Sequence, residues 1–472
     1  MHGGEPLFTP GEMGVADRTA AAMGVPGLVL MEAAGRVVAR AAVRMGVART
    51  LVLCGPGGNG GDGFVAARVL AQLGWPVAVA VWGEVRAGSD AAAMRGRWRG
   101  PVVPFEVVEV RRAGLVVDAV FGAGMRGEVP DAVAEGLAAA GRVLAVDVPS
   151  GLDGRTGQAR GRVRGVDRTV TFAGLKPGHL VLPGRALCGV VEVGDIGMPR
   201  GALPGVLAWR NGPGLWRLPR VGAQSHKYIR GHVTVVGGAA MTGAARLAAG
   251  AARRVGAGLV TVASGGCGDL YRGGEAGLIV DDAPLAVQVA DGRRNAWVCG
   301  PGLGVEAAAT ALPVLIGGGR MVVADADALG MAAGAPERLL GASVATPHGG
   351  EFVKVFGPIG EDRIAAVRAA AVRIGGVVVL KGADTVVAGP DGRVVVNDNA
   401  PPWLATAGAG DVLSGVIGGL LAQGMPAWEA ACAGVWLHGA AGGMAGEGLI
   451  AEDLLQWLGA AAKASEVRYG EG

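Results

Sequence analysis

Three polar clusters in the first half of the chain have residue types that suit cation binding and proton transfer. They are Asn59 with Asp62, Asp118, and Asp147 with Ser150 and Asp153. Amide, carboxylate and hydroxyl oxygens are hard donors, which suit K⁺, Na⁺, Mg²⁺ or Ca²⁺ and disfavour a soft metal. A carboxylate that is free of the cation can act as a general acid or base. A single aspartate after a strand is more often a helix cap or a turn former, so the prediction depends on all three clusters.

The first cluster lies in a glycine-rich run, Gly55–Gly63, between the apolar stretches 51–54 and 64–70. That order predicts a strand, a tight loop and a helix. A loop of this kind can bring backbone N–H groups and a helix N-terminus against a phosphate. The run matches neither G-x-G-x-x-G nor G-x-x-x-x-G-K-[ST], so the common nucleotide-binding motifs do not identify it.

Four motifs in the second half suit nucleotide chemistry. They are Gly300–Gly304, Thr346–Glu351, Lys381–Thr385 and Ala407–Asp411. In the last, glycines before a helix expose N–H groups at its positive end, where they can hold a transferring phosphoryl group. Asp411 beside that anion hole would accept a proton from the attacking hydroxyl. Asp411 could instead only stabilise the helix dipole, His348 could be a structural histidine, and Lys381 could be a surface charge.

Strand-like apolar runs must position these motifs, and Ala-rich helical segments alternate with many of them. Such alternation predicts an α/β fold with mostly parallel sheets and helices on both faces, whose strands end at one shared crevice. The later strands of the first half have no long helices between them, which predicts an irregular or antiparallel edge. A Gly/Pro-rich stretch, 197–224, predicts a linker and two domains, 1–214 and 215–472. The chain is expected to be helical from Gly410 onward.

Composition narrows the classes of function. A chain of 472 residues with 51% hydrophobic residues favours two or more compact domains, and a net charge of +3 gives no sign of a nucleic-acid partner. Its five cysteines are scattered, which disfavours a zinc site and indicates reduced thiols. The N-terminus does not resemble a signal peptide, and glycines, Gln423 and Pro426 interrupt the apolar stretch after Asp411. We expect a cytoplasmic homo-oligomer that binds small molecules, without a nucleic-acid or membrane partner.

The first half resembles the NAD(P)H-hydrate epimerase family over nearly all of residues 10–210. The resemblance depends on the segments 30–35, 58–63, 117–124 and 147–153. It implies a Rossmann-like three-layer sandwich that interconverts the R and S forms of hydrated NADH and NADPH at C6 of the nicotinamide ring. It further implies that K⁺ is held by Asn59, Asp118 and Ser150. The hydrate would contact Gly58, Asn59, Gly60, Gly61, Asp62, Gly122, Ala123, Gly124, Met125, Arg126, Gly127, Glu128 and Asp147. Asp147 is the candidate acid/base, and Gly58 replaces an asparagine that is usual in the family.

The second half resembles the ribokinase-like superfamily, and more closely the ADP-dependent NAD(P)H-hydrate dehydratase family, over almost all of residues 225–460. The resemblance implies a ribokinase-like three-layer sandwich that dehydrates the S-hydrate while ADP becomes AMP and phosphate, with Mg²⁺ at the site. The hydrate would contact Ala244, Gly302, His348 and Asp411, with Asp411 as the catalytic base. The adenine nucleotide would contact Lys381, Gly382, Ala383, Asp384, Thr385 and Gly410. Gly349 and Ala409 depart from the usual family residues.

Together the two resemblances imply a bifunctional repair enzyme with substrates NADHX, NADPHX and ADP. The hydrate would arise as two epimers. The dehydratase would use one of them, and the epimerase would convert the other into it. Two alternatives stay open at this point. The second half could be a ribokinase-like kinase of a small hydroxymethyl substrate, or the first half could be a non-catalytic nucleotide-binding module.

Overall fold

The computed structural model describes residues 4–467, which form two compact units. One unit comprises residues 6–208, and the other comprises residues 209 onward together with Glu5. The predicted boundary at 214/215 therefore falls inside the second unit. The difference arises because β9 (Ala208–Arg210) is a strand of the second sheet and lies beside β18. Its short length and Gly/Pro-rich surroundings hide that pairing in the sequence.

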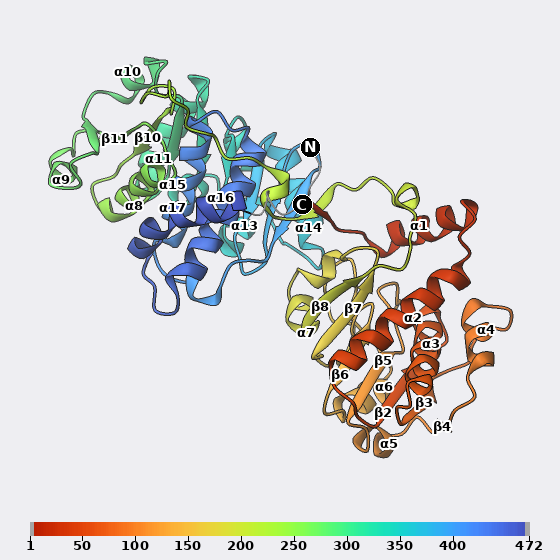
Figure 1. The fold of residues 1–472 in the computed structure, drawn as a ribbon. Helices are drawn as coiled ribbons and strands as arrows, with labels where there is room; N and C mark the ends of the chain where they lie inside the picture. Colours follow the sequence, from red (N-terminus) through yellow and green to blue (C-terminus); the bar gives the residue numbers. More distant parts are fainter. Residues whose placement is uncertain (1–3, 468–472) are drawn as a thin grey trace. The chain divides into compact units, whose positions relative to one another are not determined.

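The first unit is built on a seven-stranded sheet in the order β4-β3-β2-β5-β6-β7-β8 (Figure 1). The strands are β2 (Thr50–Cys54), β3 (Val77–Val81), β4 (Val102–Val103), β5 (Leu115–Ala119), β6 (Val143–Val146), β7 (Arg168–Phe172) and β8 (Val190–Gly194). All of its pairings are parallel, including β6 with β7 and β7 with β8. The expected antiparallel edge is therefore wrong. The connection from β6 to β7 is irregular, and the connection from β7 to β8 contains only the short helices η1 (Pro177–His179) and α7 (Gly184–Leu187), so no long helix is required.

Helices cover both faces of this sheet, as the sequence predicts. They are α1 (Pro10–Ala22), α2 (Gly27–Arg44), α3 (Gly58–Gln72), α4 (Asp90–Arg97), α5 (Val107–Arg111), α6 (Asp131–Ala138) and α7 (Gly184–Leu187). One apolar core packs α2 and α3 against the sheet, and a second packs α6 against the opposite face. A capping box fixes the start of α1, because Thr9 and Glu12 bond each other's backbone N–H groups.

The second unit is built on an eleven-stranded sheet in the order β1-β9-β18-β17-β16-β15-β14-β13-β10-β11-β12. Its other strands are β1 (Glu5–Pro6), β10 (His232–Val236), β11 (Leu259–Ala263), β12 (Ile279–Asp281), β13 (Ala296–Cys299), β14 (Met321–Ala324), β15 (Val344–Ala345), β16 (Val377–Leu380), β17 (Thr385–Ala388) and β18 (Val394–Asn397). The strands from β12 to β16 pair in parallel, whereas β16, β17 and β18 pair antiparallel. The carboxyl ends of the parallel strands thus share one edge.

Helices flank the second sheet, and the predicted helical C-terminal region is confirmed. They are α8 (Thr242–Arg254), α9 (Asp269–Arg272), α10 (Leu285–Ala290), α11 (Val305–Gly317), α12 (Asp327–Gly330), α13 (Gly349–Phe356), α14 (Arg363–Ile374), α15 (Ala409–Ala422), α16 (Ala427–Ala445) and α17 (Ala451–Val467). The helices α8 and α15 approach very closely, since a Cβ atom at Gly415 would lie 2.0 Å from the carbonyl oxygen of Ala248. Both units are thus three-layer α/β sandwiches, as predicted.

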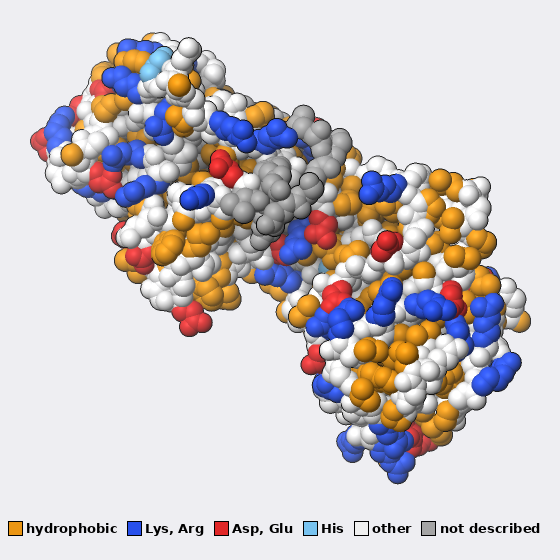
Figure 2. All heavy atoms as spheres, viewed as in Figure 1, with side chains coloured by type: hydrophobic (Ala, Val, Ile, Leu, Met, Phe, Trp, Pro, Cys, Tyr) orange, Lys and Arg blue, Asp and Glu red, His pale blue; other side chains and the backbone are white. Residues whose placement is uncertain are grey.

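Neither sign of charge dominates the face of the molecule that Figure 2 shows. Figure 2 shows basic side chains spread over both units on the viewed face, with acidic side chains among them. Within residues 4–467, no helix is both long enough and apolar enough to cross a membrane.

Candidate active sites

A cavity of about 420 Å³ lies at the carboxyl ends of the strands in the first unit. Six residues predicted from the sequence line it: Gly58, Asn59, Asp62, Ala123, Gly124 and Asp147. Residues that the sequence interpretation did not select also line it, among them Asp17, Met31, Phe172 and Lys176. Met125 to Glu128 are not among the lining residues, and Arg126, Gly127 and Glu128 are exposed.

The glycine-rich run forms the first turns of α3, which begins at Gly58, so the expected loop up to residue 63 is wrong. A Cβ atom at Gly60 would lie 1.9 Å from the carbonyl oxygen of Gly55. At Gly61 it would lie 2.4 Å from Sδ of Met31. The glycines therefore allow α3 to begin in close contact with Gly55 and Met31, which places Asn59 and Asp62 at the cavity.

Asp147 is the most constrained side chain in this cavity. Its backbone has a φ of 67°, which is rare for a residue other than glycine. Its Oδ1 lies 2.8 Å from Nζ of Lys176 and accepts a hydrogen bond of 2.9 Å from Thr171, while its Oδ2 accepts one of 3.1 Å from the N–H of Ala123. Burial opposes ionisation, but Lys176 and the N–H of Ala123 lower the pKa of Asp147 to about 2. The carboxylate is thus ionised at neutral pH.

His179 contacts the backbone of Asp147. Its Nδ1 accepts from the N–H of Lys176 at 3.0 Å, so its Nε2 carries the proton and donates to the carbonyl oxygen of Asp147 at 2.8 Å. Burial, with Lys176 nearby, lowers the pKa of His179 to about 4, which keeps the ring neutral. Lys176 and His179 were not predicted, because no spacing links them to Asp147.

Asp62 has the opposite electrostatic setting to Asp147. It is buried at the cavity wall, and no hydrogen bond or ion pair to its carboxyl group is found within residues 4–467. Burial and the nearby charges of Asp147 and Asp17 raise the pKa of Asp62 well above its usual value. One cavity therefore contains two carboxyl groups whose pKa values are shifted in opposite directions.

The three predicted cation ligands are brought to neighbouring positions. Ser150 donates from its hydroxyl to Oδ1 of Asp118 at 2.6 Å and from its N–H to Oδ2 at 2.8 Å. Asn59 donates its amide N–H to the carbonyl oxygen of Val146 at 2.7 Å. Its Oδ1 lies close to Gly122, since a Cβ atom at Gly122 would be 2.4 Å from it. Asp118 is only 1% exposed, and burial raises its pKa although Ser150 opposes the shift. Across the described residues there is no group of three His, Cys, Asp or Glu side chains that could hold a metal ion.

In the second unit, the predicted anion hole is the first turn of α15. Gly408 precedes it with a φ of 85°, and the helix begins at Ala409. Asp411 lies in this turn, where burial and the charge of Asp325 raise its pKa to about 6 while Lys381 opposes the rise. A carboxylate with this pKa is ionised at neutral pH and can still accept a proton.

Lys381 lies beside that turn. Its Nζ is 2.7 Å from Oδ1 of Asp325, and a Cβ atom at Gly410 would be 3.3 Å from the same Nζ. Ser414 donates its hydroxyl to the other oxygen of Asp325. Burial lowers the pKa of Lys381, but Asp325 and Glu351 outweigh it and raise the pKa overall. Lys381 is therefore a fixed cation at the helix start and not a surface charge.

A cavity of about 400 Å³ adjoins this cation. Predicted nucleotide residues line it, namely Lys381, Gly382, Ala383, Thr385 and Gly410, and so does His348. Its remaining wall is largely apolar and includes Pro401, Leu404, Leu413 and Val435. Asp384 is the exception among the nucleotide residues, since it is buried outside the lining and lies 3.7 Å from Arg363.

His348 is the N-cap of α13, at the end of β15. Its Nδ1 accepts from the N–H of Gly350 at 3.0 Å, so its Nε2 carries the proton. The side chain is 61% exposed and lines the same cavity as Lys381. A second histidine, His438, lines this cavity and was missed by the sequence interpretation, because it lies inside an unremarkable apolar helix.

The other two predicted hydrate residues lie next to each other. A Cβ atom at Gly302, whose φ is 63°, would be 3.1 Å from the Cβ atom of Ala244. Ala244 is in the first turn of α8, which packs against α15. The structure thus brings Ala244, Gly302, Asp411 and Lys381 to one edge of the second sheet.

Known protein families match this chain in both units. A family model described as NAD(P)H-hydrate dehydratase matches residues 233–458, and one described as the N-terminus of YjeF-related proteins matches residues 27–178. A bifunctional NAD(P)H-hydrate repair enzyme from Moorella thermoacetica is 37% identical, over 96% of this chain and 96% of the relative. This chain belongs to the family of bifunctional NAD(P)H-hydrate repair enzymes. A member from Mycobacterium tuberculosis is 39% identical over 81% of this chain and 80% of its own length.

Family membership confirms the predicted pairing of an epimerase with a dehydratase and the assignment as an enzyme. Among solved structures, the ADP/ATP-dependent NAD(P)H-hydrate dehydratase from Bacillus subtilis is 27% identical, with a TM-score of 0.45 over 52% of this chain and 94% of that chain.

Proposed function

We propose that the cavity of the first unit interconverts the R and S hydrates, and that the edge of the second unit around Asp411 removes water from the S-hydrate with an adenine nucleotide as phosphoryl donor. The observation that carries the proposal is Asp411, a carboxyl group with a pKa of about 6 in the first turn of α15 beside Lys381. A proton acceptor, a helix N-terminus and a cation in one place suit phosphoryl transfer from a nucleotide to a hydroxyl.

In the dehydratase reaction, Asp411 accepts the proton of the C6 hydroxyl while the oxygen attacks the terminal phosphoryl group of ADP. The O–P bond forms, the bond between the β-phosphorus of ADP and the oxygen that bridges its two phosphorus atoms breaks, and AMP leaves with that oxygen. Loss of the C5 proton and of phosphate from C6 then restores the C5=C6 double bond. Phosphorylation is useful here because phosphate is a much better leaving group than hydroxide. Lys381 and the N–H groups at the start of α15 would neutralise the charge that develops on the phosphoryl oxygens.

In the epimerase reaction, inversion at C6 requires one group that takes a proton and another that supplies one. Asp147 is ionised and held in place by Lys176 and Thr171, which supports its assignment as the base. Asp62 faces the same cavity and favours the neutral form, which supports its assignment as the proton donor. Environments that push two pKa values apart suit an acid and a base that work together.

A monovalent cation fits beside this pair. The Asp118 carboxylate is almost fully buried, and within residues 4–467 its hydrogen-bond partners are the neutral groups of Ser150 and Val120. A buried carboxylate without a counter-charge is costly, so K⁺ held by Asn59, Asp118 and Ser150 would restore the balance. At the second site, Asp325 and Asp327, which follow β14, would hold Mg²⁺, and the ion would supply positive charge that offsets the charge of the nucleotide phosphates. ADP as the donor, the cytoplasmic location and the homo-oligomeric state stay predictions.

The test is chiral chromatography of a mixture of NADHX epimers with the full-length enzyme. With ADP, Mg²⁺ and K⁺ both epimers should disappear, and without ADP they should only interconvert. Asp411→Asn should abolish dehydration and retain epimerisation, whereas Asp147→Asn should leave the R epimer behind. If Asp411→Asn consumed the S epimer at the normal rate, the assignment of the base would be wrong. Accumulation of a stable phosphorylated product would instead indicate a kinase.

A further inference from the structure

A second cavity of about 440 Å³ lies on the same edge of the second unit, away from the nucleotide cavity. Its wall includes Val236 and Ala263, which end β10 and β11, and Ala307 and Ala311 from α11. The cavity adjoins the predicted hydrate residue Gly302, because Leu303 lines it and a Cβ atom at Gly238 would lie 2.4 Å from the carbonyl oxygen of Gly302. Nothing in the proposed chemistry uses this cavity.

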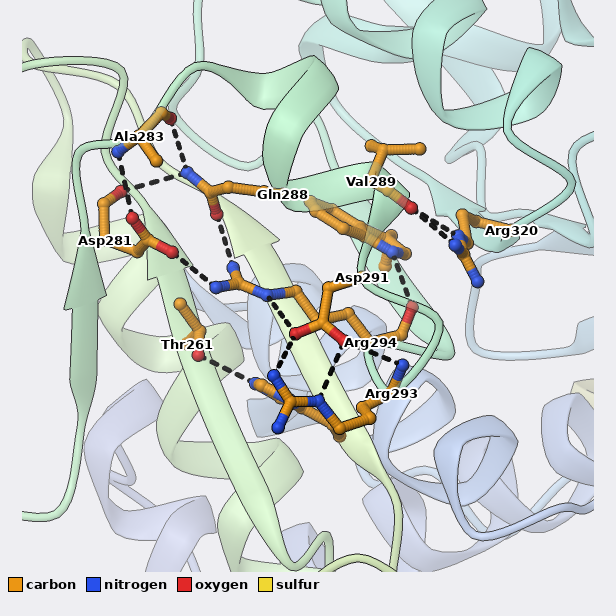
Figure 3. A network of polar contacts seen from close by, with 11 residues as sticks. Thr261, Asp281, Ala283, Gln288, Val289, Asp291, Arg293, Arg294 and Arg320 are labelled. Carbon is orange, nitrogen blue, oxygen red and sulfur yellow. Dashed lines mark hydrogen bonds and ion pairs between the residues drawn. The ribbon is translucent and has the colours of Figure 1, made fainter.

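A network of polar contacts holds Ala283 and Gln288, which line this cavity (Figure 3). The amide nitrogen of Gln288 donates to the carbonyl oxygens of Ala283 at 2.7 Å and Asp281 at 3.1 Å. Arg294 bridges the side chains of Gln288 and Asp281, as the figure shows. Tyr271 donates its hydroxyl to the carbonyl oxygen of Gly238, another lining residue, at 2.6 Å. The cavity is therefore preformed, which lowers the entropic cost of binding a ligand there.

The order of the strands decides from which side the acceptor reaches Asp411. Along the sheet edge, the cavity at β11 and β10 comes first, then Gly302 after β13, Asp325 after β14, and Lys381 with the nucleotide cavity at β16. In-line transfer places donor and acceptor on opposite sides of the moving phosphoryl group. With the nucleotide at β16, the hydrate must therefore approach from the side of β13 and β10, where this second cavity lies.

The hydrate is a dinucleotide, and its reacting ring is only one end of it. No charged side chain lines the cavity within the described residues, and the wall is mostly apolar with Ser264, Gln288 and Thr310 as polar groups. Such a wall suits the flat apolar face of a base better than a phosphate. We propose that this cavity binds the adenosine half of the hydrate during dehydration. The proposal rests on the proposed function of the second unit.

The test compares NADHX with the hydrate of reduced nicotinamide mononucleotide, which has the same reacting ring and lacks the adenosine half. Wild-type enzyme should prefer NADHX in kcat/KM by about tenfold or more. Ala307→Trp fills the cavity from an exposed position of α11, so it should remove most of that preference and leave kcat/KM for the mononucleotide hydrate within about twofold. Ala309→Trp is the matched control, because Ala309 is exposed on the same helix and does not line the cavity.

Equal losses of both substrates in Ala307→Trp would overturn the proposal, and so would an unchanged preference for NADHX. A wild-type enzyme without preference for NADHX would also overturn it. Thermal unfolding of both tryptophan variants shows whether the fold is intact. If the wild-type enzyme failed to dehydrate either hydrate in the presence of ADP, the proposed function itself would be wrong, which is a different result.

Discussion

Replacement of Lys176 by methionine tests whether this lysine holds Asp147 in its ionised form. Nζ of Lys176 lies 2.8 Å from Oδ1 of Asp147, and the two side chains are 4% and 15% exposed. Methionine has a similar length and no charge, so Lys176→Met leaves a buried carboxylate without its counter-charge. Breaking a buried pair by removing one partner costs about 3–5 kcal/mol.

The pKa of Asp147 gives a second, independent magnitude and a sign. Its lowering from 3.8 to about 2 corresponds to about 2 kcal/mol of stability, present above pH ~4 and lost as the pH falls through ~2. In Lys176→Met, burial raises the pKa of Asp147 above its unfolded value, so stability is greatest at low pH and is lost as the pH rises. Loss of Lys176 also changes the pKa of His179, which Lys176 helps to lower to about 4. The pKa of His179 rises in the variant, which likewise reduces the loss of stability at low pH.

Hydrogen exchange of the β6 and β7 peptides in the full-length protein measures the effect, with correction for the intrinsic rate at each pH. Lys176→Met should lose about 3 kcal/mol or more at pH ~7, and the deficit should shrink at pH ~5. Arg36→Met is the control, because Arg36 is 56% exposed and its pair with Glu32 should be worth less than about 1 kcal/mol. A loss in Lys176→Met no larger than in the control, or a deficit that grows at pH ~5, would refute the reasoning.

Two further predictions follow from the same sites. Asp411 has a pKa of about 6 and must be ionised to accept a proton, so kcat/KM for dehydration should fall about tenfold per pH unit below ~6. A pH profile of dehydration, measured beside that of epimerisation, checks this. A flat dehydration profile down to pH ~5 would contradict it. Gly122→Ala places a Cβ atom 2.4 Å from Oδ1 of Asn59. Epimerisation should therefore need a K⁺ concentration about tenfold higher, by the usual cost of displacing a ligand, and titration with K⁺ tests this. Gly141→Ala is the control, because no atom lies within 4 Å of its Cβ position.

Much of the architecture could be predicted from local patterns. Runs such as 115–120 and 377–380 are apolar and β-branched and bounded by turn residues, and both form buried strands. The glycines before α15 indicate an anion hole, since a helix start with exposed N–H groups is a local property. The parallel pairing of β7 and β8 was missed, because pairing direction depends on how the intervening chain returns.

In the first unit, the sequence reasoning selected candidate residues at strand ends. Asp118, Asp147 and Ser150 were found in this way, because parallel strands bring their ends to one edge. Lys176 and Ser414 were not, since neither has a local pattern that ties it to the carboxylate it contacts. The short strand β9 was missed for the same reason, as its partner β18 lies far along the chain.

The sequence by itself determined the family, the two three-layer units, and the identity of the aspartates that lie at the strand ends. These follow from short motifs and from apolar periodicity, which are local. The tertiary structure alone decided the pKa values of these carboxyl groups, because burial and neighbours in space raise or lower them. Lys176 lowers the pKa of Asp147, whereas burial and the charge of Asp147 raise that of Asp62, which has no ion-pair partner within residues 4–467; burial and Asp325 raise the pKa of Asp411 to about 6.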